Sequence, residues 1–129
     1  VDLRNIDETK LKKAEYLLKQ KIEHICLEEK VNVETEQLVR FKPVNFDKRI
    51  SNIIANIADE KGLQCTRLNS GAGHDAQMMA RICPTSMIFV PSKDGISHNP
   101  REYTSKEHLN YGLQILYETI NRIDSNLLD

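Results

Sequence analysis

Two loops of this sequence carry the residue types that bind metal ions and polarise carbonyl groups. The first, "SGAGHDAQMMA" from Ser70 to Ala80, places two glycines, a histidine and an aspartate just before a helix-forming run. The second, "PSKDGISHNP", carries His98. Neutral imidazole is the commonest nitrogen ligand of zinc and related metals, and glycine lets the backbone approach a ligand closely. These loops are therefore the candidate functional site.

The same residues have structural interpretations that stay open at this point. His98 is either a metal ligand or an ordinary loop histidine, and Asp75 fits the N-cap of the following helix. Gly71 and Gly73 permit a positive φ, and their exposed N–H groups suit a carbonyl oxygen or a developing oxyanion. A phosphate is the competing ligand, but the loop lacks the GK[ST] ending of a P-loop and the full dinucleotide fingerprint.

The elements that must position these loops are predicted to form an α/β sheet. Alternating or compact apolar patterns predict strands at 1–6, 31–41, 63–68 and 86–90. Apolar residues at helical spacing predict helices at 8–30, 46–61, 76–82 and 105–123. Helices that alternate with strands indicate the α/β class, in which ligands bind beyond the carboxyl ends of the strands. We therefore expect the two loops to face one crevice.

Local signals fix where several of these helices begin and end. Asp7 is a predicted N-cap, Gly62 is a predicted left-handed C-cap, and Thr104 with Glu107 forms a predicted capping box. The last helix also carries an apolar stripe that we expect to face the core, formed by Leu109, Leu113, Leu116 and Ile120.

Composition excludes several classes of partner. The 129 residues are 40% hydrophobic, which is enough for a core, and 18 basic against 19 acidic residues give a net charge of -1. A nearly neutral chain has no general attraction to nucleic acid or to anionic membranes. The sequence has no apolar run long enough for a membrane span and no secretory signal, which predicts a cytoplasmic protein. Three widely spaced cysteines predict buried free thiols.

A longer motif adds a family resemblance. "SGAGHDAQMMA" followed by "CPTSMIFVPSKDGISHNPREYTS" closely resembles the C-terminal motifs of the M20-type amidohydrolases, in the branch of the N-carbamoyl-L-amino acid hydrolases and allantoate amidohydrolases. The resemblance implies a zinc-peptidase-like α/β fold of two domains. Residues 1–42 would be the second half of the inserted lid or dimerisation domain, as strand, helix and strand. Residues 43–129 would be the C-terminal part of the catalytic domain, and the parent enzyme a homodimer.

The resemblance also implies a chemistry and a set of site residues. Two divalent ions per subunit, zinc or manganese with cobalt or nickel as alternatives, acidify a shared water that a glutamate base helps to deliver to an amide or ureido carbon. The matching residues are His98 as a metal ligand, Arg4, which grips a substrate carboxylate, Gly71, Gly73 and His74 at the substrate, and Asn99 and Glu102, which brace the His98 loop.

The other metal ligands and the glutamate base of that family belong to N-terminal motifs that this sequence lacks. We therefore expect the chain to be part of a larger enzyme that hydrolyses linear amide or ureido C–N bonds, and to be inactive alone. Its partners would be a small carboxylate-bearing substrate and a second subunit. Two alternatives remain: an aminoacylase or dipeptidase of the same fold, and a noncatalytic α/β binding module.

Overall fold

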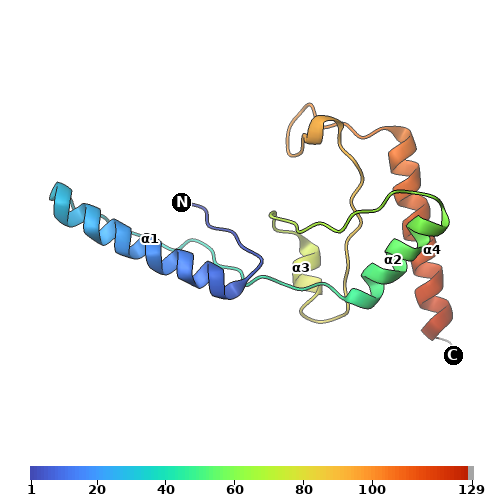
Figure 1. The fold of residues 1–129 in the computed structure, drawn as a ribbon, viewed down its shortest axis with the longest axis horizontal. Helices are drawn as coiled ribbons and strands as arrows, with labels where there is room; N and C mark the ends of the chain where they lie inside the picture. Colours follow the sequence, from blue (N-terminus) through green and yellow to red (C-terminus); the bar gives the residue numbers. More distant parts are fainter. Residues whose placement is uncertain (128–129) are drawn as a thin grey trace. The chain divides into compact units, whose positions relative to one another are not determined.

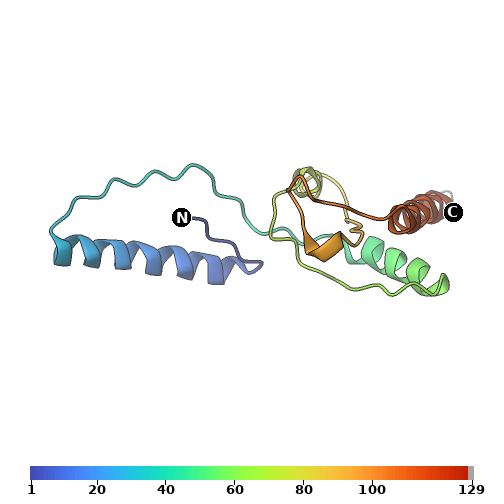
Figure 2. The same ribbon diagram turned by 90° about the horizontal axis from the view of Figure 1, so that it is seen from above.

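The computed structural model describes residues 1–127, which contain four α-helices and one short 3₁₀ helix (Figures 1 and 2). They are α1 (Glu8–Glu29), α2 (Lys48–Glu60), α3 (Asp75–Met79), η1 (Lys93–Gly95) and α4 (Lys106–Leu127). The chain divides into two compact units. Unit 1 comprises Val1–Asn45 with Asn69–Gly73, and unit 2 comprises Phe46–Leu68 with the chain from His74 onward.

Unit 1 is built on α1 and the segment that returns along it (Figure 2). The Asp7 carboxylate accepts hydrogen bonds from the Thr9 and Lys10 N–H groups, as predicted for an N-cap. The helix ends at Lys30, whose φ of 53° is left-handed. The Arg40 guanidinium then contacts Glu8 at 3.0 Å and Glu15 at 2.9 Å, which holds the returning segment against α1.

Unit 2 is held together by α2 packed against α4 (Figure 1). Ile57 and Ala58 of α2 are buried, and so is Thr119 of α4, whose hydroxyl donates to the Ile115 carbonyl at 2.7 Å. The predicted C-cap is confirmed, because Gly62 has a φ of +66° and its N–H donates to the Asp59 carbonyl. Ion pairs join the same two helices at their far ends, Arg122 with Glu60 and Lys61 with Glu118.

The segment 84–90 joins this helix pair through short polar contacts and one close approach. The Asp47 N–H donates to the Thr85 carbonyl at 2.8 Å, and the hydroxyls of Ser51 and Ser86 lie 3.0 Å apart. Further along, a Cβ added to Gly112 would lie 2.5 Å from Cγ1 of Val90. Gly112 therefore lets the segment lie directly on α4.

The predicted strands are not formed within residues 1–127. The segments 1–6, 31–41, 63–68 and 86–90 lie outside regular structure, and no backbone hydrogen bond joins any two of them in the described part of the chain. A β-strand is stabilised by hydrogen bonds to a neighbouring strand, and two-stranded ribbons are marginal on their own. The apolar pattern shows which face of a segment suits burial, but it supplies no partner. The α/β description of the fold is therefore not confirmed.

Two predicted helix starts are displaced by one residue. His74 has the extended backbone of an N-cap and its carbonyl accepts from the Gln77 N–H, so Asp75 is the first residue of α3 rather than its cap. Ser105 accepts from the His108 N–H at 3.2 Å, so it caps α4 in place of Thr104. At α4 the cap is the residue whose side-chain oxygen reaches the third N–H, whereas none of the described side chains caps the start of α3.

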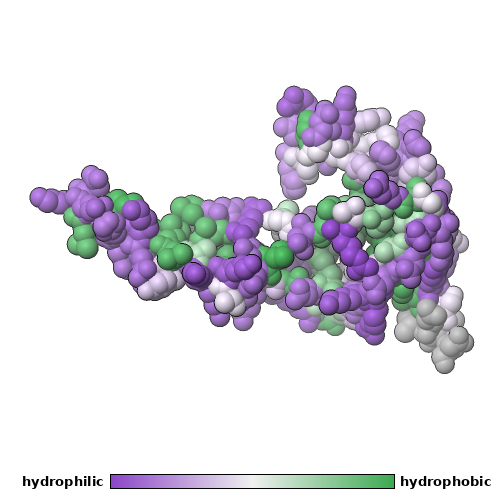
Figure 3. Space-filling model, viewed as in Figure 1, coloured by the Kyte–Doolittle hydropathy of each residue, from purple (hydrophilic) through white to green (hydrophobic). Residues whose placement is uncertain are grey.

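Little apolar surface is buried in this chain. Among the described residues, the buried hydrophobic side chains are Leu11, Ile57 and Ala58. The stripe expected to face the core is exposed instead, with Leu109 at 53% and Leu113 at 63%. The stripe lines an open apolar groove of about 490 Å³ between α2, α4 and the segment 86–90, and no side chain of the described residues fills this groove. Figure 3 shows hydrophobic residues at the surface among hydrophilic ones.

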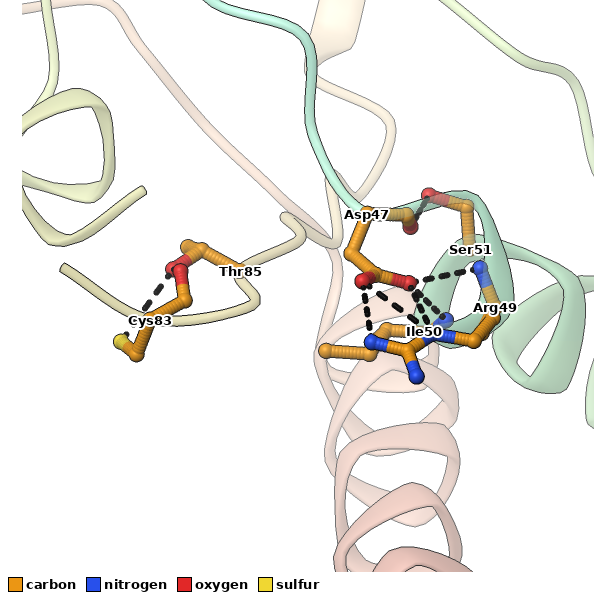
Figure 4. Close-up of polar contacts among 6 residues, drawn as sticks. All are labelled: Asp47, Arg49, Ile50, Ser51, Cys83 and Thr85. Atoms are coloured by element: carbon orange, nitrogen blue, oxygen red, sulfur yellow. Dashed lines mark hydrogen bonds and ion pairs between the residues drawn. The ribbon is translucent and has the colours of Figure 1, made fainter. Parts of the chain in front are cut away.

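The cysteines also differ from the expectation of buried thiols. All three are free, but Cys65 and Cys83 are exposed and Cys26 is half-buried. Cys83 lies beside Thr85 (Figure 4). Its Sγ is 3.4 Å from the Met79 carbonyl. With so few buried side chains, an apolar residue type is no guarantee of a buried position.

The start of α2 predicts a measurable pH dependence. Arg49 and two backbone N–H groups surround the Asp47 carboxylate and lower the pKa of Asp47 from 3.8 to about 2, with the Arg49 hydrogen bond as the largest cause (Figure 4). A lowered pKa stabilises the folded state fully above about pH 3.8, and this contribution is lost as the pH falls towards 2. An NMR titration of the Asp47 carboxyl should therefore show a midpoint near 2. Arg49→Gln should raise that midpoint, and a midpoint near 3.8 in the unmodified chain would contradict the contact.

Candidate functional site

The guanidinium of Arg4 lies between a carboxylate and a loop carbonyl within unit 1. Its Nε donates to both oxygens of Asp2 at 3.0 Å, and its Nη2 donates to Asp2 Oδ2 at 2.6 Å. Its Nη1 donates to the Gly71 carbonyl at 2.7 Å. Two elements that the sequence analysis assigned to substrate binding, 67 residues apart in the chain, are therefore in direct contact.

Local geometry explains why Asp2 reaches Arg4. Residues two apart on an extended segment project to the same side, so their side chains can form a parallel pair. Each group alters the other: the hydrogen bond from Arg4 lowers the pKa of Asp2, and the hydrogen bond to Asp2 raises the pKa of Arg4. Asp2 was not among the site residues predicted from the sequence. The D-x-R spacing on an alternating segment is the signal that would have revealed it.

The SGAGHD loop is positioned differently from the prediction. Neither Gly71 nor Gly73 has a positive φ, and a Cβ on either would meet nothing within 4 Å in the described part of the chain. The requirement for glycine is therefore not explained by backbone strain. The contribution of the loop that the structure does record is the Gly71 carbonyl, which accepts from Arg4. His74, in unit 2, caps α3 and its ring packs edge-on to Phe89 with centroids 5.9 Å apart.

His98 lies in a loop of unit 2 that is closed by hydrogen bonds at both ends. The Lys93 N–H donates to the Tyr103 carbonyl at 2.8 Å, which brings the start and end of the loop together. His98 has a φ of 54°, in the left-handed region that most side chains avoid. Its backbone N–H donates to Glu102 Oε2 at 2.8 Å. The imidazole is exposed to solvent.

Asn99 completes this turn. Its carbonyl accepts from the Glu102 N–H at 2.9 Å, and its side-chain oxygen accepts from the Arg101 N–H at 3.0 Å. The structure thus brings together three residues predicted for this loop: His98, Asn99 and Glu102. The Glu102 carboxylate hydrogen-bonds to the backbone of His98 and thereby holds the position of the His98 Cα, from which the imidazole extends.

The described residues do not fit a binuclear metal centre by themselves. Residues 1–127 contain no group of three or more His, Cys, Asp or Glu side chains that could hold one ion. A zinc site generally needs three or four protein ligands. A metal pair at His98 would therefore need ligands from outside these residues. Of the helices between residues 1 and 127, none combines the length and the apolar character of a membrane span.

Comparison with known proteins identifies the family. Residues 5–122 match the family described as peptidase family M20/M25/M40. The chain belongs to this family. Among M20 relatives, the allantoate amidohydrolase of Bacillus subtilis is 39% identical over 102 residues, which are 79% of this chain and 25% of that protein. The N-carbamoyl-L-amino-acid amidohydrolase of Rhizobium meliloti is 33% identical over 120 residues, 93% of this chain and 29% of that protein.

Structural similarity to solved M20-type proteins supports the same family assignment. The amidase of the hydantoinase/carbamoylase family from Burkholderia vietnamiensis superimposes with a TM-score of 0.80 and 32% identity, over 89% of this chain and 28% of that one. The resemblance found in the sequence is therefore confirmed. The chain spans about a quarter to three tenths of the length of these curated M20 relatives.

Proposed function

We propose that this chain forms part of a metal-dependent hydrolase of linear amide or ureido C–N bonds, with N-carbamoyl amino acids or allantoate-like molecules as the substrate class. The observation that carries the proposal is the contact between Arg4 and the Gly71 carbonyl, because it joins two elements assigned to the substrate. The names of the relatives support the same reaction class.

Arg4 would recognise the carboxylate of such a substrate. A guanidinium is a planar donor that pairs with a carboxylate through two parallel hydrogen bonds, which an ammonium group cannot reproduce. Arg4 is largely exposed, so a ligand can reach it. Gly71, Gly73 and His74 would line the substrate from the adjoining loop.

His98 would take part in metal binding and not in substrate binding, as one ligand of a metal pair. Bound divalent ions would supply an acidified water and polarise the scissile carbonyl. The contribution of this chain is to hold one imidazole on a loop closed by Glu102 and Asn99. The remaining ligands, the general base and a second subunit would lie outside the sequence described here, with residues 1–42 as part of a lid or dimerisation domain and residues 43–129 as part of the catalytic domain.

The test of this proposal is Arg4→Lys in the complete enzyme that contains this chain. Lysine keeps the positive charge but loses the planar fork, so KM for carboxylate substrates should rise by roughly tenfold while kcat changes little. Steady-state kinetics with N-carbamoyl amino acids, allantoate and N-acyl amino acids would measure both the effect and the substrate class. An unchanged KM would show that Arg4 is an ordinary surface residue with no role in substrate binding. A preference for N-acyl substrates would favour the aminoacylase alternative.

A further inference from the structure

Asp2 occupies the edge of the Arg4 guanidinium formed by Nε and Nη2, and each terminal nitrogen keeps one further N–H group. Arginine has five N–H donors: one on Nε and two on each terminal nitrogen. The single Nε donor and one Nη2 donor are directed at Asp2, and one Nη1 donor is directed at Gly71. One N–H on Nη1 and one on Nη2 remain.

Both remaining donors can hydrogen-bond to the oxygens of a further carboxylate. A carboxylate pairs with arginine by accepting one N–H at each of its oxygens, in the plane of the guanidinium. Asp2 and Gly71 together fix that plane, since they hold three nitrogens from two directions. An unrestrained arginine side chain would lose rotamer freedom on binding, whereas one already held would lose less.

We propose that Asp2 is a positioning residue for substrate recognition: it orients Arg4 so that the remaining N–H groups of its terminal nitrogens receive the substrate carboxylate. The inference rests on the proposed function of Arg4. Asp2 would also affect specificity, because its negative charge offsets that of Arg4 and the directions of the remaining N–H groups then decide which ligand binds. A carboxylate offers two acceptor oxygens to these N–H groups, whereas an uncharged carboxamide offers only one.

The matched change is Asp2→Asn in the complete, metal-loaded enzyme. Asparagine has nearly the same shape, but its amide nitrogen would face an arginine N–H donor and cannot accept from it. KM for an N-carbamoyl amino acid should rise by about tenfold with kcat within about twofold, as for loss of substrate binding alone. KM for the corresponding carboxamide should not change. Asp2→Glu, which restores the carboxylate, should recover part of the loss.

Glu36→Gln is the control. Glu36 also lies in unit 1, is exposed, and has no ionic contact recorded among residues 1–127, so its loss should leave both substrates unaffected. Product amino acid binding, measured by calorimetry, gives the same comparison without turnover. An unchanged or lower KM in Asp2→Asn would overturn the proposal, because Asp2 would then be inert or a competitor of the substrate. Equal losses for acid and carboxamide would overturn it too, because they indicate a structural effect.

Comparison with Arg4→Lys distinguishes failure of the Asp2 role from failure of carboxylate recognition by Arg4. If Arg4→Lys raises KM but Asp2→Asn does not, the positioning role of Asp2 fails and the proposed function stands. If neither change alters KM for carboxylate substrates, carboxylate recognition by Arg4 fails, and the role of Asp2 fails with it.

Discussion

Replacing His98 by alanine in the complete enzyme should lower the affinity for one metal ion by about tenfold or more and remove most of kcat. The proposed reason is that His98 would be a ligand of an ion that activates the attacking water. The fold should persist, because His98 is exposed and its recorded hydrogen bond is made by the backbone N–H. Metal analysis after dialysis and steady-state kinetics would measure the two effects. Full activity with full metal content would exclude His98 as a ligand.

The left-handed backbone of His98 requires a second variant. Alanine tolerates a φ of 54° poorly, so His98→Ala changes the loop as well as the ligand. Asparagine is among the residues that adopt this conformation most readily. His98→Asn should therefore keep the loop and still weaken the binding of that metal ion. Glu102→Gln, which weakens the acceptor of the His98 N–H, should produce a smaller loss if Glu102 only holds the loop.

The 129-residue chain on its own should bind no metal pair and hydrolyse neither N-carbamoyl amino acids nor allantoate. His98 alone cannot hold two ions, and residues 1–127 contain no other cluster that could. The chain should also self-associate. It exposes 10965 Å² of surface, whereas a folded monomer of its mass, 14.8 kDa, exposes about 7,000 Å².

Size-exclusion chromatography, metal analysis and a ureido-hydrolase assay on the purified chain would test this. Leu113→Lys or Leu113→Glu, in the exposed stripe of α4, should reduce self-association, because a charged side chain there opposes burial of the groove. A control charge at Asn121, which is also exposed on α4 but does not line the groove, should not. Stoichiometric metal with measurable turnover, or a compact inactive monomer, would contradict the prediction.

The parts of the structure that could be predicted from sequence are those decided by neighbouring residues. Asp7 caps α1 and Gly62 ends α2 because each interaction lies within a few residues of the chain. The family resemblance was also readable, because the motifs around His74 and His98 are continuous. The contact between His98 and Glu102 is local as well, whereas a bracing role for Glu102 in the enzyme stays a prediction.

The parts that could not be predicted depend on a partner that the pattern does not specify. Four segments have the composition of strands, yet none pairs with another within the described residues. The stripe of α4 was identified correctly as apolar, but the pattern does not specify what covers it, and the stripe lines an open groove. The contact of Arg4 with Gly71 joins positions 67 apart, and neither residue type announces it. The residue type of Asp2 does not mark it as a site residue, and only its spacing of two from Arg4 indicates the contact.

The separation of Arg4 and Gly71 also has a consequence for the order of folding. Closing a loop of 67 residues costs roughly 4 kcal/mol of chain entropy, which a single exposed hydrogen bond does not recover. Helices α1 and α4 need only local contacts and form on a faster timescale. The contact between Arg4 and Gly71 should therefore be among the last to form, after both helices, and any ligand that depends on this contact would find no site until folding is nearly complete.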